Sequence, residues 1–150
     1  MRLVVQRVRS AVVEIDQNIH SQIKEGLMLL IGIESGDSEV DAHYLAMKCA
    51  SMRLFEDNNG KMNLSLKEVA GEVLIVSQFT LHASTKKGNR PSFIKAARPE
   101  KAIPLYEYFI KQMESTLQHK VQTGKFGANM QITLINEGPV TILLDSKNKE

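Results

Sequence analysis

The sequence predicts an α+β fold, in which helices pack on a mixed, largely antiparallel β-sheet. The first third of the chain groups β-branched residues in short runs, which is typical of strands. Residues 26–33 are almost continuously apolar, as expected of a strand that is covered on both faces. Two later segments repeat apolar residues at helical spacing. The length of 150 residues suits one domain, and no linker or repeat divides the chain, so we expect a single domain over residues 1–150.

Short strands and turns alternate through the first half of the chain. Strands are predicted at residues 3–8 and 11–15, and residues 16–18 form a candidate turn. Residues 57–60 carry a strong turn signal, because Asn and Gly tolerate a positive φ. Residues 73–76 form a second apolar run and predict another buried strand.

The first helix is predicted to start at Asp37 or Ser38. The four residues from Ser38 have the spacing of a capping box, in which a side-chain acceptor and a carboxylate satisfy free backbone N–H groups. Val40, Tyr44 and Met47 follow at helical spacing and would form the apolar face of this helix.

The second helix is predicted over about residues 99–118. Pro104 lies inside this range and removes one backbone hydrogen bond. Two possibilities stay open: the helix starts near Ile103, or it is kinked at Pro104. The residues of its predicted apolar face are Leu105, Tyr106, Phe109, Ile110, Met113 and Leu117.

Composition describes an ordinary globular protein, with 43% hydrophobic and 24% charged residues and a formal net charge of +2. One stretch stands out: residues 86–101 contain six basic residues and one acidic residue, a local net charge of +5. The stretch could bind a polyanionic partner, or it could be a solvated loop.

The single cysteine, Cys49, excludes an intrachain disulfide. It falls within a helical pattern, where a small buried hydrophobic residue is favoured over a nucleophile. No apolar stretch approaches the about 18 residues of a membrane span, and basic and polar residues interrupt the N-terminus, unlike in a signal peptide. We therefore expect a cytoplasmic protein with no membrane partner.

The sequence lacks the usual spacings of metal and cofactor sites. Its four histidines do not fall in a zinc-binding pattern, and neither a phosphate-binding loop nor a dinucleotide fingerprint occurs. We expect neither a metal nor a cofactor.

Two short segments instead place small and polar residues beside predicted buried strands, where packing alone favours aliphatic residues. Residues 77–81, Ser-Gln-Phe-Thr-Leu, follow the apolar run at residues 73–76. Residues 136–141, Asn-Glu-Gly-Pro-Val-Thr, form a corner between predicted closing strands at residues 132–135 and 140–144.

The first of these segments has three interpretations. Backbone N–H groups at a strand end can form an oxyanion hole, which makes Ser77 to Thr80 candidate catalytic residues. Alternatively, Ser77 and Thr80 only bond within the strand end while Phe79 fills the core. A third interpretation pairs His82 with Thr80 as in a serine hydrolase, because residues two apart share one face of a strand.

Together the two segments resemble the signature pair of the D-aminoacyl-tRNA deacylases, esterases that remove D-amino acids, and glycine wrongly attached, from transfer RNA. Residues 3–8, 55–64, 87–93 and 122–127 are also similar to segments of that family, in the same order, so the resemblance covers nearly the whole chain. One departure follows Leu81, where this chain has His-Ala-Ser instead of the more usual aromatic or small residue, alanine and acid.

The resemblance implies a proofreading hydrolase whose catalytic segment holds the ester carbonyl near the backbone of Gln78, Phe79 and Thr80. Phe79 would help to place the terminal adenosine, and the ribose 2′-hydroxyl would relay a proton. Two roles for Thr80 stay open: its hydroxyl is a covalent nucleophile, or it only positions the substrate. Because no general base is evident near it, the noncovalent role is favoured. The implied catalytic residues are Ser77, Gln78, Phe79 and Thr80.

The resemblance also implies that Gly138 and Pro139, joined by a cis bond, turn their carbonyls toward the substrate amine. An L side chain would collide with this corner, whereas a D side chain or glycine would not. The corner would enter the active site of the other subunit of a homodimer, and Met130 would line the same pocket. Lys86, Lys87 and Arg90 are tentative tRNA-binding residues.

Two other classes of function remain possible. The chain could be a noncatalytic RNA-binding module that uses the basic stretch, although Phe93 is the only aromatic residue there. It could also be a structural dimer without activity. Hydrolysis, binding without hydrolysis, or neither, on incubation with D-tyrosyl-tRNA would separate the three.

Overall fold

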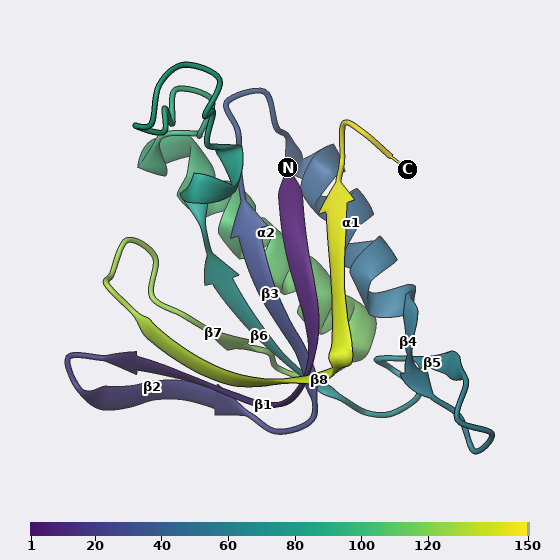
Figure 1. Cartoon of the computed structure of the whole chain (residues 1–150). Coiled ribbons are helices and arrows are strands. Elements are labelled where there is room, and N and C mark those ends of the chain that lie inside the picture. The colour runs from purple at the N-terminus through teal and green to yellow at the C-terminus, as the bar shows by residue number, and fades with distance from the viewer. Residues whose placement is uncertain (150) are drawn as a thin grey trace.

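In the computed structural model, which describes residues 1–149, the chain forms a six-stranded sheet, a small two-stranded sheet and two long helices (Figure 1). The elements in chain order are β1 (Arg2–Ile15), β2 (Asn18–Ile23), β3 (Gly26–Gly32), α1 (Glu39–Ser51), β4 (Arg53–Glu56), β5 (Met62–Ser65), β6 (Glu72–Ser77), the 3₁₀ helix η1 (Phe79–His82), α2 (Pro99–Leu117), β7 (Gln122–Thr123) and β8 (Gln131–Asp145).

The large sheet is mixed, as predicted. β1 pairs antiparallel with β2, β3 and β8, whereas β3 and β6, and then β6 and β7, pair in parallel. The apolar strands β3 and β6 lie at the centre, and nearly all of their residues are buried. β4 and β5 form a separate hairpin across the predicted turn, where the Asp57 carboxylate accepts the N–H groups of Asn59 and Lys61.

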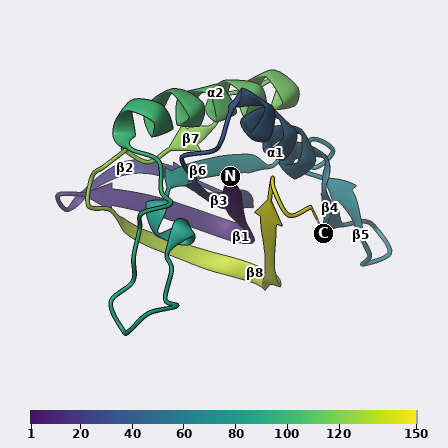
Figure 2. The same cartoon turned by 90° about the horizontal axis from the view of Figure 1, so that it is seen from above.

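Both helices cover the same face of the sheet (Figure 2). The core between these layers includes Leu29, Ile75, Phe109 and Met113, all of which are fully buried. A second buried cluster, around Met28 and the other apolar residues that point away from the helices, forms where the bent ends of β1 and β8 fold over the sheet.

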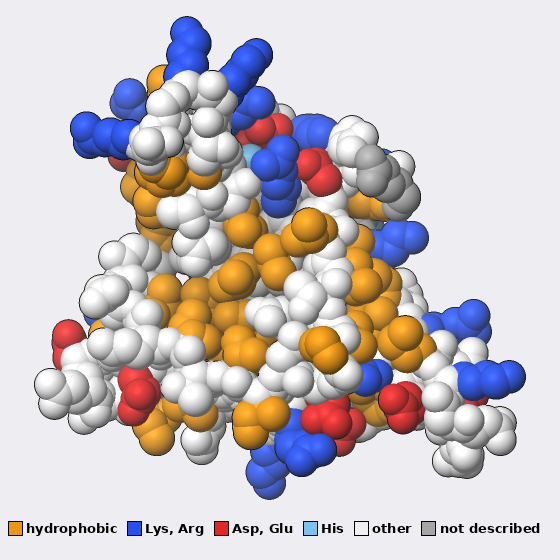
Figure 3. Space-filling model, in the orientation of Figure 1, with side chains coloured by type: hydrophobic (Ala, Val, Ile, Leu, Met, Phe, Trp, Pro, Cys, Tyr) orange, Lys and Arg blue, Asp and Glu red, His pale blue; other side chains and the backbone are white. Residues whose placement is uncertain are grey.

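Part of the face opposite the helices is apolar and uncovered. Val4 pairs directly with both Leu30 and Leu143, so these three side chains lie side by side on that face. Leu143 is 76% exposed, and Val4 and Leu30 are only half-buried. Figure 3 shows hydrophobic side chains gathered across the middle of this face.

The strand boundaries differ from the prediction at both ends of the chain. Residues 3–8 and 11–15 belong to one strand, β1, and β8 likewise runs through the predicted corner instead of stopping on either side of it. The two long strands pair with each other along most of their length, and shifts of register around Val8 bend them together without ending them. The short strands β2 and β7 were not predicted.

The cap of the first helix is confirmed, but its predicted apolar face is wrong. Ser38 precedes the helix, and the Asp41 carboxylate accepts the backbone N–H of Ser38 at 2.9 Å. Val40 is 77% exposed. Small side chains allow α1 to approach α2 and the sheet closely, and its buried apolar residues are Ala42, Leu45, Ala46, Cys49 and Ala50.

Cys49 is fully buried, and burial raises the pKa of its thiol to about 12. A thiol in this state is not a nucleophile near neutral pH, so the interpretation of Cys49 as a small core residue is confirmed.

The second helix begins at Pro99 and continues through Pro104, so the alternative start near Ile103 is wrong. Its predicted apolar face is buried apart from Ile110, which is half-buried. Neither helix in the described part of the chain combines the length and apolar character needed to cross a membrane.

Candidate active site

The segment at residues 77–81 lies where the central strand β6 ends. Ser77 is the last residue of β6 and pairs with Ile31 of β3, and the N–H of Gln78 donates to the Ile31 carbonyl at 2.7 Å. The chain then turns into η1, in which Leu81 N–H donates to the Gln78 carbonyl. The alternative in which Ser77 and Thr80 bond within the strand end while Phe79 fills the core is wrong, because Phe79 and Thr80 lie in η1 and Phe79 is 56% exposed.

The start of η1 has backbone N–H groups that make no hydrogen bond within the helix. The first N–H groups of a helix have no carbonyl acceptor within that helix. At η1 these are the N–H groups of Phe79 and Thr80, which are the groups that an oxyanion hole would need. The hydroxyl of Thr80 accepts a hydrogen bond from the side-chain amide of Gln78.

A cavity of about 300 Å³ opens beside this turn. The ends of β3 and β6, the start of α2 and residues 126–130 line it. Ser77, Gln78, Phe79 and Met130 all contribute to the lining, so four of the predicted site residues lie around one cavity although more than fifty positions separate the first from the last.

Phe126 also lines the cavity, and no role was predicted for it. Its ring lies 5.9 Å from the ring of Tyr106 on α2, whose hydroxyl donates to the Ile75 carbonyl at 2.8 Å. Burial raises the pKa of Tyr106, so the ring stays neutral and keeps its donor. This chain of contacts fixes the cavity wall to the central strand.

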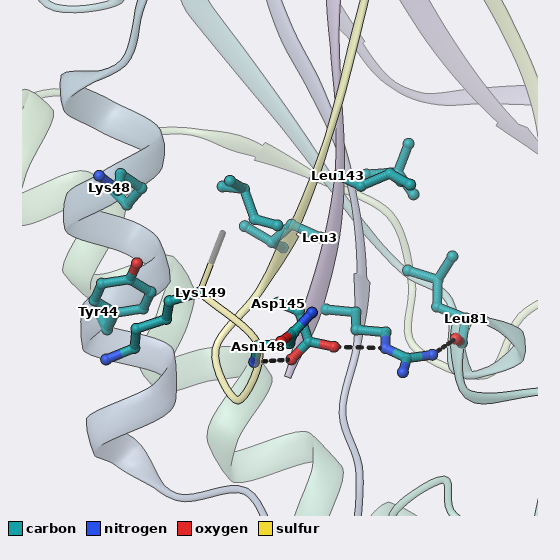
Figure 4. Close-up of a pocket in the computed structure, with 11 residues that line it drawn as sticks. Leu3, Tyr44, Lys48, Leu81, Leu143, Asp145, Asn148 and Lys149 are labelled. Carbon is teal, nitrogen blue, oxygen red and sulfur yellow. Dashed lines mark hydrogen bonds and ion pairs between the residues drawn. The ribbon is translucent and has the colours of Figure 1, made fainter.

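A second contact holds the far end of η1. Arg2 donates to the Leu81 carbonyl at 3.0 Å and to the Asp145 carboxylate at 2.9 Å. Dashed lines mark both bonds in Figure 4, which shows them at the edge of a second hollow, of about 430 Å³, between α1 and the paired ends of β1 and β8. Arg2 therefore ties η1 to two strands of the sheet.

His82 does not pair with Thr80. Its side chain is buried, and among the described residues neither ring nitrogen has a hydrogen-bond partner. The nearest charged group is the Glu34 carboxylate, 3.7 Å from Nδ1. In a 3₁₀ helix, which has three residues per turn, residues two apart do not share a face, so the triad-like arrangement lacks its geometry.

The corner at Gly138 and Pro139 lies away from this cavity within one chain. Both residues are exposed at the bend of β8, far from the end of β6 in Figure 1. The Gly138–Pro139 bond is cis, as expected from the resemblance. The buried Arg7 side chain donates to the Glu137 carbonyl at 3.3 Å and to the Leu54 carbonyl at 2.6 Å, and so braces the corner from behind.

Gly138 has no room for a side chain. Its φ is +120°, a conformation that L residues rarely adopt. A Cβ atom there would come within 2.9 Å of the Val140 side chain and 3.0 Å of the Arg7 guanidinium. The residue type at this position therefore follows from the local backbone.

The basic stretch forms a projecting loop. Ser84 and Ser92 exchange two backbone hydrogen bonds, of 2.8 and 2.9 Å, which close the loop at its base. Lys86, Lys87 and Arg90 are exposed on it. The loop extends beyond the body of the protein in Figure 2, and basic side chains crowd that end of the molecule in Figure 3.

Comparison with known proteins gives one consistent result. The model of the D-Tyr-tRNA(Tyr) deacylase family matches residues 4–145. Proteins named D-aminoacyl-tRNA deacylase from Cytophaga hutchinsonii and Akkermansia muciniphila are 61% and 59% identical to this chain, over the full length of both partners in each case.

Two solved structures share the fold. A structure described as the c-Myc DNA unwinding element binding protein is 39% identical with a TM-score of 0.92, and the match covers 97% of this chain and 98% of the other. A structure described as a probable eukaryotic D-amino acid tRNA deacylase has a TM-score of 0.83 at 16% identity, covering 95% and 97%.

Proposed function

The chain belongs to the D-Tyr-tRNA(Tyr) deacylase family, and from this membership we propose that it hydrolyses the ester bond of D-aminoacyl-tRNA, releasing the D-amino acid and tRNA. The observation that carries the proposal is the identity of 61% over the full length of a curated deacylase. The cavity beside Ser77 to Phe79 is large enough to be the proposed site of the ester. We also propose that the protein acts in the cytoplasm, where an aminoacyl-tRNA substrate would be found.

The chemistry requires little beyond positioning, because an aminoacyl ester is already activated. With the ester carbonyl at the start of η1, the N–H groups of Phe79 and Thr80 would stabilise the negative charge that develops as water attacks. Collapse of that intermediate breaks the bond to the ribose oxygen, and the neighbouring 2′-hydroxyl relays the proton.

Thr80 has a positioning role in this proposal. Its hydroxyl accepts from the Gln78 amide, and an amide is not a base that could activate a nucleophile. The pair instead fixes the Gln78 side chain at the cavity mouth. The mechanism that we propose uses no metal ion.

We further propose that the protein is a homodimer and that each cavity is completed by Gly138 and Pro139 of the other copy. Neither Gly138 nor Pro139 lines the cavity of its own chain, and the uncovered apolar face around Leu143 offers a surface for self-association. A rigid corner that excludes L side chains suits an enzyme that accepts many side chains of one handedness, and it leaves glycyl-tRNA as a substrate.

The test is hydrolysis of D-tyrosyl-, L-tyrosyl- and glycyl-tRNA by the purified protein in the presence of a chelator. We expect release from the D and glycyl esters and none from the L ester. Ala128→Trp, which fills the cavity, should abolish release. The same bulk placed on the exposed face of α1 by Val40→Trp should have no effect.

Equal rates with the D and L esters would refute the assignment of handedness. Loss of activity on chelation, with recovery on adding zinc, would refute the metal-independent mechanism.

A further inference from the structure

Two exposed aromatic rings meet at the mouth of the cavity. Phe79, at the start of η1, is 56% exposed, and Phe93, which follows the basic loop, is 37% exposed. Their ring centroids are 5.1 Å apart at an angle of 75°, an edge-to-face contact. Large apolar rings at the surface usually gain by burial, yet each of these keeps more than a third of its area in water. The pair is therefore a surface feature and not part of the core.

The fold creates this pair. In the sequence Phe93 is the only aromatic residue of the basic stretch at residues 86–101. The Ser84–Ser92 hydrogen bonds return the chain to the body of the protein, and this return places Phe93 against Phe79. An aromatic surface and a cationic loop thus adjoin each other beside the cavity.

Residues 83–99, which include the loop and Phe93, carry charge of a single sign. Lys86, Lys87 and Arg90 lie on the loop, and Lys95 and Arg98 follow Phe93. All five are exposed, and residues 83–99 contain no acidic residue. The positive charge is therefore not neutralised by acidic residues within the segment.

We propose that Phe93 and the loop at residues 84–92 bind the single-stranded nucleotides that precede the terminal adenosine of the substrate. The base next to the adenosine stacks on the exposed area of Phe93, and the loop cations contact the preceding phosphates. This inference rests on the proposed function, which puts the ester at the start of η1, and on the expectation from the resemblance that Phe79 helps to place the terminal adenosine. Exposed aromatic rings bordered by cations are the usual recognition surface for single-stranded RNA.

The test compares two substrates that differ only in the nucleotides at issue. One is D-tyrosyl-tRNA, and the other is the D-tyrosyl ester of adenosine, which has no preceding nucleotide. Phe93→Ala should lower kcat/KM for the tRNA about tenfold more than for the nucleoside ester, because one stacked base is lost. Phe93→Trp should restore the tRNA preference. Ile94→Ala, which removes the adjacent 90% exposed side chain, is the matched control and should change neither value.

Reversal of the loop charges by the triple variant K86E/K87E/R90E should raise KM for the tRNA and flatten its dependence on salt, because each phosphate contact releases counterions. The nucleoside ester should show no such change in salt dependence.

Binding of a labelled single-stranded oligonucleotide that ends in the tRNA 3′ sequence gives a second readout that needs no hydrolysis. Weaker binding by Phe93→Ala supports the proposal even if the wild-type protein cleaves neither ester, an outcome that would refute only the proposed function. Equal losses on both substrates would overturn the proposal, since the ring would then only support the cavity. A loss on charge reversal without a loss in Phe93→Ala would also overturn it, because the loop would then contact phosphates while the ring stacks on no base.

Discussion

In the mechanism that we propose, the Thr80 hydroxyl lies beside the reaction centre but is not the nucleophile. The Gln78 side-chain amide donates to the Thr80 hydroxyl, and the imidazole of His82 is buried and makes no hydrogen bond to it. Attack by a threonine hydroxyl needs a base, whereas the backbone donors of η1 do not depend on the side chain at position 80.

We therefore expect Thr80→Ala to keep D-aminoacyl-tRNA hydrolysis within about tenfold of the wild-type rate, since removing a true oxyanion-hole donor costs about 10²–10³. Single-turnover kinetics measure the effect, and Thr80→Ser is the matched control because it keeps the hydroxyl. Trapping an acyl group on Thr80 by mass spectrometry would contradict the noncovalent mechanism.

The residues of the cavity were predictable to different degrees. Ser77, Gln78, Phe79 and Met130 were proposed from motifs, and the fold brings them to one cavity. Phe126 was missed because its position depends on Tyr106, a contact made by a helix twenty residues away in the sequence. The only signal for Phe126 in the sequence was that residues 122–127 resemble a segment of the D-aminoacyl-tRNA deacylases.

At the scale of elements, the start of α1 depends on one carboxylate. Burial by itself would raise the pKa of Asp41, but hydrogen bonds from Lys147, Ser146 and Ser38 outweigh it, and the pKa is well below the ordinary 3.8. Lys147 lies 2.9 Å from this carboxylate and so links the C-terminal segment to α1.

This lowered pKa has a definite consequence for stability. Because the folded state favours the ionised form, Asp41 stabilises the fold above its ordinary pKa, and the contribution is lost as the pH falls below that value toward the folded pKa. We expect Asp41→Asn to lower the free energy of unfolding by about 1 kcal/mol at pH 7, the usual cost of a lost cap, and by less at pH 3.

Urea unfolding at the two pH values measures this difference. Glu39→Gln, in the same turn but exposed, should change stability little at either pH. An equal loss at pH 7 and pH 3 for Asp41→Asn would show that the side chain acts through its shape and not through its charge.

Element prediction failed where long-range pairing decides the outcome. The residues between 8 and 11 were predicted to separate two strands. In the structure β1 continues through them, because it stays paired with β8, and the register shifts there bend the strand. The α1 face was misjudged because alanines and Cys49 carry a weak apolar signal, although small residues are what a close helix contact requires. By contrast, α2 has large apolar residues in a regular pattern, and its buried face was predicted almost completely.

At the scale of the whole molecule, the two signature segments, residues 77–81 and 136–141, lie in different parts of the folded chain. The cavity is next to β6, and the Gly138–Pro139 corner is exposed at the bend of β8. The sheet leaves the apolar row of Leu143, Val4 and Leu30 partly uncovered between them. The homodimer that we propose, in which each copy completes the site of the other, would account for all of these features.

The shared site that we propose combines the cavity of one copy with the corner of another. It is tested most directly with heterodimers of two inactive variants, co-expressed with different affinity tags. Ala128→Trp fills its own cavity but keeps its corner, whereas Gly138→Leu keeps its cavity but distorts its own corner, where a side chain collides with Val140 and Arg7. Both homodimers should be inactive.

The measurement is D-tyrosyl-tRNA hydrolysis by the purified heterodimer. It contains one site in which an intact cavity meets an intact corner, so we predict about half of the wild-type activity per dimer. A heterodimer as inactive as both homodimers, or a Gly138→Leu homodimer with full activity, would contradict the shared site.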